Sequence, residues 1–109
     1  MVSEIINTNI TKMKTLDEIK NILSQHKEEI KQKYPVKEIG IFGSYVRGEE
    51  KEASDLDILV ELGKAIGLLK FIEIEEYLSE LLGVKVDLVM KGALKPRIGK
   101  RILKEVVYV

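Results

Sequence analysis

The order of apolar patterns along the 109-residue chain places the strongest limit on its fold. Apolar residues at helical spacing predict helices, and β-branched or alternating apolar runs predict strands. The predicted helices cover 16–34, 68–82 and 96–105. The predicted strands cover 36–42, 55–62 and 84–90. The order helix–strand–strand–helix–strand–helix predicts a small α/β (α+β) domain, with a short mixed β-sheet flanked by helices.

The length of the chain allows one domain with a single core, because a chain of this size buries roughly two thirds of its unfolded surface. Thr15 and Glu18 form the pattern of a capping box, which predicts a helix start at this point. The preceding residues are polar and irregular. We therefore expect an N-terminal arm over 1–14 and a single domain over 15–109, with no room for a second domain that binds a substrate.

The charges of the chain balance, with 18 Lys and Arg residues against 18 Asp and Glu residues. A zero net charge gives no bulk attraction to a polyanion, so we expect no direct binding of nucleic acid. The lack of Cys excludes a thiolate zinc site. No secretion signal opens the chain and no apolar stretch approaches 18 residues, so we expect a cytoplasmic protein with no membrane association.

Gly43 and Ser44 lie where the first predicted strand ends and a short helical turn can begin. A glycine lets the backbone approach a ligand closely, and a helix start presents free N–H groups beside the Ser44 hydroxyl. Such a turn suits a phosphate group. Gly-Ser turns are also common without any ligand, so the pair alone is weak evidence for a phosphate site.

Asp is depleted in strands, yet three of the four Asp residues lie inside apolar, strand-like runs. Asp55 and Asp57 are two positions apart, so on a strand both carboxylates point to the same face. Two neighbouring carboxylates repel each other unless a cation lies between them, and their oxygens suit Mg²⁺. The alternative is an acidic strand end that faces water.

Asp87 lies in the middle of the third predicted strand. If that strand neighbours the strand of Asp55, three carboxylates could hold two cations in the arrangement used for phosphoryl and nucleotidyl transfer. A strand-edge Asp exposed to water is the alternative.

The spacing of these residues resembles a known signature. Gly43-Ser44, ten further residues, Asp55-x-Asp57 and a later strand Asp are similar to the motif of the DNA polymerase beta-like nucleotidyltransferase superfamily. The fuller stretches GSYVRG over 43–48 and SDLDILV over 54–60 resemble the minimal nucleotidyltransferase (MNT) proteins in particular. The similarity spans most of the chain after residue 15.

The resemblance implies a Mg²⁺-dependent enzyme that uses ATP. Asp55 and Asp57 would bind two Mg²⁺ ions, and Asp87 would complete the nucleophile-side metal site and help to deprotonate the attacking hydroxyl. The hydroxyl would attack the α-phosphorus of ATP, and pyrophosphate would leave. These three aspartates are therefore the expected catalytic and metal-binding residues.

The resemblance also implies the residues that bind the nucleotide. Gly43 and Ser44 would hold the triphosphate. Arg47, three residues beyond Ser44 on the same face of the turn, would reach phosphate or the partner. The alternative for Arg47 is a solvated side chain at a helix end.

The minimal subgroup is typically paired with a small helical HEPN protein, often an RNase toxin. The resemblance therefore implies an antitoxin that transfers AMP to a tyrosine hydroxyl of a HEPN toxin, with which it forms a hetero-oligomer. Two alternatives stay open. The chain could neutralise a toxin by binding alone, or it could modify a small molecule or an RNA that a helical partner holds.

The C-terminal segment is compatible with a partner surface. The last predicted helix has a basic stripe, whose members are Arg97, Lys100, Arg101 and Lys104. A solvated helix face is the simpler explanation of the stripe. The apolar tail over 106–109 could pack on this domain or on another chain.

Overall fold

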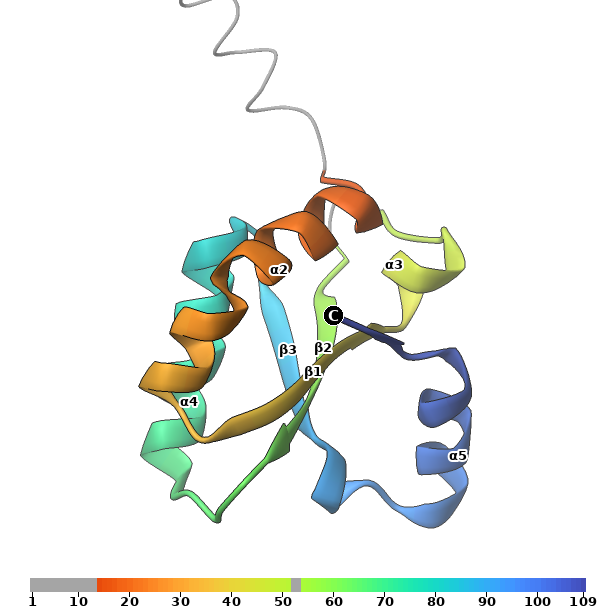
Figure 1. The fold of residues 1–109 in the computed structure, drawn as a ribbon. Coiled ribbons are helices and arrows are strands. Elements are labelled where there is room, and N and C mark those ends of the chain that lie inside the picture. Colours follow the sequence, from red (N-terminus) through yellow and green to blue (C-terminus); the bar gives the residue numbers. More distant parts are fainter. Residues whose placement is uncertain (1–13, 52–53) are drawn as a thin grey trace, which may run out of the picture.

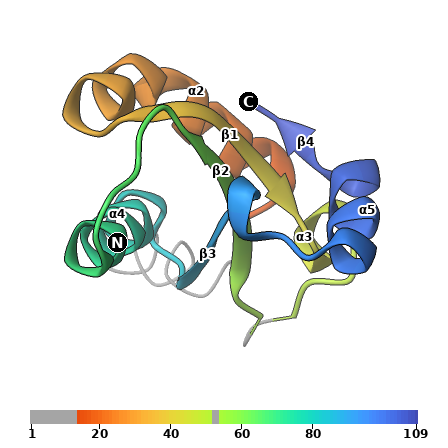
Figure 2. The ribbon, with the colours of Figure 1, turned by 90° about the horizontal axis from the view of Figure 1, so that it is seen from below.

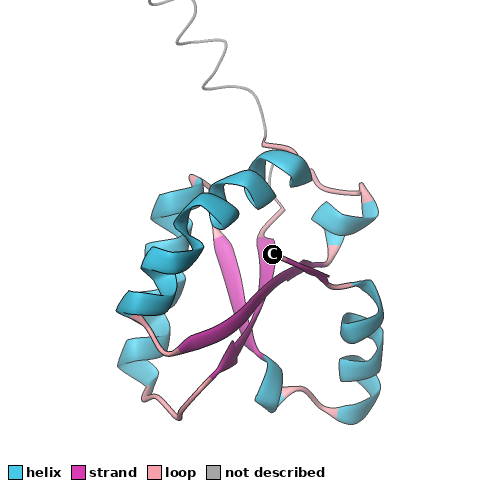
Figure 3. Ribbon diagram, viewed as in Figure 1, coloured by secondary structure: helices cyan, strands magenta, loops and turns pink. Residues whose placement is uncertain are grey.

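The computed structural model describes residues 14–51 and 54–109. Its elements follow the order expected for an α/β domain with a mixed sheet, so the predicted fold class is confirmed (Figures 1 and 3). The helices are α2 (Leu16–Lys33), α3 (Ser44–Arg47), α4 (Leu68–Leu82), the 3-10 turn η1 (Lys91–Ala93) and α5 (Pro96–Glu105). The strands are β1 (Val36–Phe42), β2 (Leu56–Leu62), β3 (Val86–Met90) and β4 (Val107–Tyr108).

Local sequence signals set the ends of the long helices. The Thr15 hydroxyl accepts a hydrogen bond from the Glu18 amide, and the Glu18 carboxylate accepts one from the Thr15 amide, which confirms the predicted capping box. Helix α4 ends at Gly83, whose left-handed backbone closes the last turn. Pro96 occupies the first turn of α5, where its missing N–H costs nothing.

The strand order of the sheet is β3-β2-β1-β4. Strands β1 and β2 are antiparallel, whereas β2 and β3 are parallel because α4 connects them across the sheet. The parallel register pairs Asp57 with Asp87, and the antiparallel register pairs Asp57 with Phe42. These pairings bring the end of β1 and the starts of β2 and β3 to one edge of the sheet.

One face of the sheet forms the core with α2 and α4, which lie side by side (Figures 1 and 2). The strand residues at alternating positions supply the sheet side of this core, and they are Ile39, Ile41, Leu56, Ile58, Val60, Val86 and Leu88. The intervening positions point to the other face, because successive strand residues alternate. Asp57 and Asp87 therefore lie on the face opposite the two long helices.

The C-terminal segment packs along β1. Strand β4 pairs with β1 at Gly40 and Ile41, and the Val109 amide donates a hydrogen bond to the Ile39 carbonyl. The apolar tail thus packs on this domain, which was one of the two possibilities that the sequence left open. Gly40 is required at this contact, since a Cβ there would lie 2.5 Å from Val106 Cγ2.

Two boundaries differ from the sequence prediction. Strand β2 begins at Leu56 and β3 at Val86, so Asp55, predicted to be in the strand, lies one residue before the observed β2, and Val84 and Lys85 lie before β3. The Leu56 amide bonds to the Lys85 carbonyl, which starts the ladder at that point. Most of the predicted arm over 1–14 falls outside the described residues. None of the described helices is long and apolar enough to cross a membrane.

We predict that Gly40→Ala detaches the C-terminal segment from β1. The added methyl must displace Val106 or the Tyr108 ring, and overpacking of this kind costs about 1–3 kcal/mol of unfolding free energy. Chemical denaturation of the variant measures the loss. Gly92→Ala is the matched control, because a Cβ at Gly92 would meet no atom within 4 Å. Equal stability of the two variants would contradict the predicted contact.

Candidate active site

The turn after β1 depends on a glycine. Gly43 has φ +83° and ψ −151°, a backbone conformation that only glycine adopts readily. A Cβ at Gly43 would also overlap Asp57 Oδ2. The turn therefore needs both the backbone freedom and the missing side chain of this residue. The short helix α3 follows directly, with Ser44 as its first, half-buried residue.

Asp57 is the central acid of the site. It is half-buried on β2, beside the Gly43 turn and in register with Asp87 on β3, whereas Asp87 and Asp55 are exposed. Burial, together with the negative charges of Asp87, Asp55 and Glu105, raises the pKa of Asp57 to about 6, although the nearby Arg47 lowers it. The carboxylates are thus close enough to repel one another.

These acids fit a divalent cation in the chemistry of their oxygens and in their mutual repulsion. Across residues 14–51 and 54–109, however, no group of three or more His, Cys, Asp or Glu side chains is arranged closely enough to hold a metal ion. The structure brings Asp57 and Asp87 into register and leaves Asp55 just before the strand. A cation would have to draw the three side chains together.

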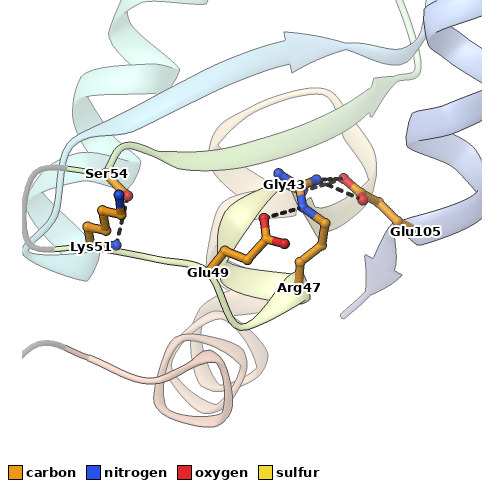
Figure 4. Close-up of polar contacts among 6 residues, drawn as sticks. All are labelled: Gly43, Arg47, Glu49, Lys51, Ser54 and Glu105. Carbon is orange, nitrogen blue, oxygen red and sulfur yellow. Dashed lines mark hydrogen bonds and ion pairs between the residues drawn. The ribbon is translucent and has the colours of Figure 1, made fainter.

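Arg47 and Glu105 join α3 to the end of α5 beside this turn (Figure 4). Glu105 Oε2 accepts a hydrogen bond of 2.6 Å from the Gly43 amide. Arg47 donates from Nη1 to both oxygens of Glu105, at 3.0 and 3.1 Å, and from Nε to Glu49 at 2.9 Å. These hydrogen bonds with Glu49 and Glu105 raise the pKa of Arg47, so the guanidinium is held between two acids.

Glu105 was missed by the sequence prediction. A signal was present, because Glu105 is the only acid of α5 and it lies at the C-terminal end of that helix. A negative charge is unfavourable there with respect to the helix dipole, so a local partner is expected. Its partners, Gly43 and Arg47, are about 60 residues away in the sequence, which local patterns do not reveal.

A pocket of about 320 Å³ lies between the Gly43 turn and α5. Its lining residues are Phe42, Gly43, Arg47, Asp57, Ile98, Arg101, Ile102 and Glu105. Three of the predicted site residues thus share this pocket, whereas Ser44, Asp55 and Asp87 lie outside its lining. Arg101 belongs to the basic stripe of α5, so that one member of the stripe faces the site. A larger pocket of about 620 Å³, around 60–66 and 90–93, contains none of the predicted site residues.

We predict that Gly43→Ala destabilises the fold far more than Gly48→Ala. Both glycines have positive φ, but Gly48 is in the left-handed helical region and a Cβ there would meet no atom within 4 Å. The strain at Gly43 and the overlap with Asp57 together should cost about 3 kcal/mol or more, against about 1 kcal/mol at Gly48. Thermal and chemical unfolding measure the loss of stability in each of the two variants. A similar loss in the two variants would show that Asp57 does not confine the turn.

We also predict that Asp57→Asn stabilises the metal-free protein above pH 6. The pKa of Asp57 rises from 3.8 to about 6 on folding, so the wild type loses stability as the pH rises from about 4 to 6. Above that range the variant should be more stable by about 1 kcal/mol, or roughly 4–8 °C in Tm, after allowance for solvent screening. Asp87→Asn, at an exposed acid of the same group, should give a smaller gain. A variant no more stable than the wild type at pH 7 would contradict the repulsion.

Comparison with known proteins identifies the family. The family described as "Nucleotidyltransferase domain" matches residues 23–109. The protein adenylyltransferase MntA of Thermococcus cleftensis is 61% identical over 97 residues, which cover 89% of this chain and 98% of the relative. A relative in Methanocaldococcus jannaschii, whose name also contains protein adenylyltransferase, is 58% identical over 98 residues, with 89% of this chain and 100% of the relative covered.

Solved structures agree with this fold. A protein described as a minimal nucleotidyltransferase matches with a TM-score of 0.64 and 34% identity, over 82% of this chain and 86% of that one. A toxin–antitoxin complex solved with AMP-PNP contains a chain that shares the fold at a TM-score of 0.65 and 21% identity, with 77% and 69% of the two chains covered. The chain belongs to the nucleotidyltransferase domain family, and within it to the minimal nucleotidyltransferases.

Proposed function

We propose that this nucleotidyltransferase transfers AMP from ATP to a hydroxyl group of a partner protein, and that it acts in this way as the antitoxin of a toxin–antitoxin pair. One observation carries the proposal: Asp57 lies beside the Gly43 turn, in register with Asp87, in a pocket that Arg47 also lines. The site thus combines acids with donors that suit phosphate. The 61% identity to a protein adenylyltransferase supports the choice of a protein as acceptor.

The proposed reaction forms one bond and breaks one at the α-phosphorus, and it moves one proton. The acceptor oxygen bonds to the α-phosphorus of ATP, the bond from that phosphorus to the β-phosphate bridging oxygen breaks, and pyrophosphate leaves with the electron pair. The proton of the acceptor hydroxyl passes toward Asp87, which is exposed and so accessible to an acceptor. The Gly43 amide, the Ser44 hydroxyl and Arg47 bind the phosphates.

Asp55, Asp57 and Asp87 would hold two Mg²⁺ ions. When bound, Mg²⁺ offsets the negative charge on the attacking and leaving oxygens. The raised pKa of Asp57 fits this role, because the same acid would give up its proton readily once a cation offsets the neighbouring charges. The chain's own contribution is to keep these acids at one edge of the sheet.

We further propose that the acceptor is a tyrosine of a HEPN toxin, bound in a hetero-oligomer. The resemblance to minimal nucleotidyltransferases and the identity to MntA support this partner. Solved toxin–antitoxin complexes share the fold at about 20% identity, and that likeness supports the fold alone. We place the reaction in the cytoplasm, where ATP is available, and assign it to a single domain over 15–109.

The first test is transfer of label from α-labelled ATP to a protein of the host extract. Asp55→Asn/Asp57→Asn should lower the labelling at least about 100-fold, because the acids that stabilise the developing charge are lost. Glu76→Gln/Glu80→Gln also removes two negative charges, from exposed positions on α4, and is the matched control. Undiminished labelling by the first variant would contradict the proposed chemistry. Antidote activity that persisted without labelling would favour neutralisation by binding alone.

A second test concerns Arg101, which lines the pocket between Asp57 and α5. We predict that Arg101→Gln weakens ATP binding about fivefold to tenfold, since charge-assisted hydrogen bonds to phosphate are among the stronger ones. Arg97→Gln is the matched control, because Arg97 lies one turn earlier on α5 and is not among the pocket-lining residues. Equal dissociation constants for the two variants, measured by calorimetry, would assign the whole stripe to solvent or to the partner.

A further inference from the structure

We propose that Glu105 occupies the place of a nucleotide phosphate, and that ATP must displace it from Gly43 and Arg47 in order to bind. The proposal rests on the proposed function, since it concerns the nucleotide site of the transfer reaction. Glu105 would lower the affinity of the free chain for nucleotide, because it competes with a phosphate for the Gly43 amide and Arg47.

The contacts of Glu105 are those expected of a bound anion. One carboxylate oxygen accepts from the Gly43 amide at 2.6 Å, and both accept from Arg47 Nη1 at 3.0 and 3.1 Å (Figure 4). Phosphate oxygens bind the same two kinds of donor, with similar lengths and directions. Glu105 also lines the pocket, and three quarters of its side-chain surface is covered. The anion is therefore inside the site rather than at its rim.

Two anions compete for the Gly43 amide, because the N–H group has one hydrogen to donate and two negative groups that shared it would repel each other. A phosphate that takes this donor must replace Glu105. Arg47 is also committed, since its Nε donates to Glu49 while Nη1 donates to Glu105. Of these two acids, Glu49 is exposed and screened by water, so Glu105 is the acid that reduces the attraction of Arg47 for an incoming triphosphate.

The fold allows the carboxylate to leave without unfolding α5. Residues after Glu105 are anchored on β1, where β4 pairs and Gly40 admits Val106, so the backbone at the end of α5 is held. Rotation of the Glu105 side chain is then the smallest movement that frees Gly43. Arg101 lies four residues earlier on α5 and lines the same pocket, so it can pair with the displaced carboxylate.

Binding of ATP and of inorganic tripolyphosphate to the purified full chain tests the proposal. Glu105→Gln keeps the size of the side chain and removes the charge, and Glu105→Ala removes the competing group. Both should bind tripolyphosphate and ATP at least about fivefold more tightly than the wild type, because a charge-assisted competitor is gone. Circular dichroism establishes that each variant is folded, and Glu105→Gln remains informative if Glu105→Ala does not fold.

Glu49→Gln is the matched control. It removes a carboxylate that bonds to Arg47 at 2.9 Å without touching Gly43, and we expect its affinity to change by less than about twofold. An equal gain in affinity for tripolyphosphate in Glu49→Gln would overturn the proposal, because it would show that loss of any nearby negative charge strengthens binding. Unchanged or weaker binding by both Glu105 variants would overturn it too, as would an ATP complex in which Glu105 Oε2 still accepts from the Gly43 amide.

These readouts are separate from AMP transfer. Tripolyphosphate has no α-phosphate ester and no base, so it reports only on the phosphate-binding donors. Failure of the wild-type chain to label a protein, with the Glu105 variants still binding tripolyphosphate more tightly, would refute the proposed function and leave the displacement intact. Labelling by the wild type, with no gain in the variants, would refute the displacement alone.

Discussion

The sheet register that brings carboxylates together at one edge is the constraint on which the candidate site depends. The parallel pairing of β2 with β3 places Asp57 in register with Asp87, and the pairing of β1 with β2 places Asp57 beside Phe42 and the Gly43 turn. Burial and the neighbouring acids raise the pKa of Asp57, so these charges oppose folding in the free protein. The proposed divalent cation would offset this repulsion.

The C-terminal segment completes this edge on the face opposite α2 and α4, where Asp57 also lies. Strand β4 is only two residues long, yet it holds the end of α5 against β1 at Gly40. That anchor directs Glu105 to the Gly43 amide and to Arg47, and it makes Arg101 a lining residue of the same pocket. Arg101 of the basic stripe therefore lines the pocket of the proposed nucleotide site, and the apolar tail holds α5 beside that pocket.

The helices, the strands and the mixed sheet could be predicted from local patterns, such as the capping box at Thr15 and the alternation around Ile58. The aspartates could be singled out because acids are unusual in apolar strands. The pairing of β4 with β1 could not be predicted, because a strand of two residues is too short to show an alternation of apolar and polar residues. Glu105 was missed for a related reason: its partners are brought near only by tertiary packing.

The proposed function depends above all on a metal site at Asp55, Asp57 and Asp87. Mn²⁺ titration of the ¹⁵N-labelled chain, followed by the amide signals, tests for this site most directly. Mn²⁺ takes the same oxygen ligands as Mg²⁺ and broadens the amide signals around its binding site. The signals of Gly43, Asp57 and Asp87 should broaden first, and Asp55→Asn/Asp57→Asn should abolish this local effect. Broadening that began instead along the Glu-rich surface of α4, or that persisted in the variant, would contradict a metal site at this edge of the sheet.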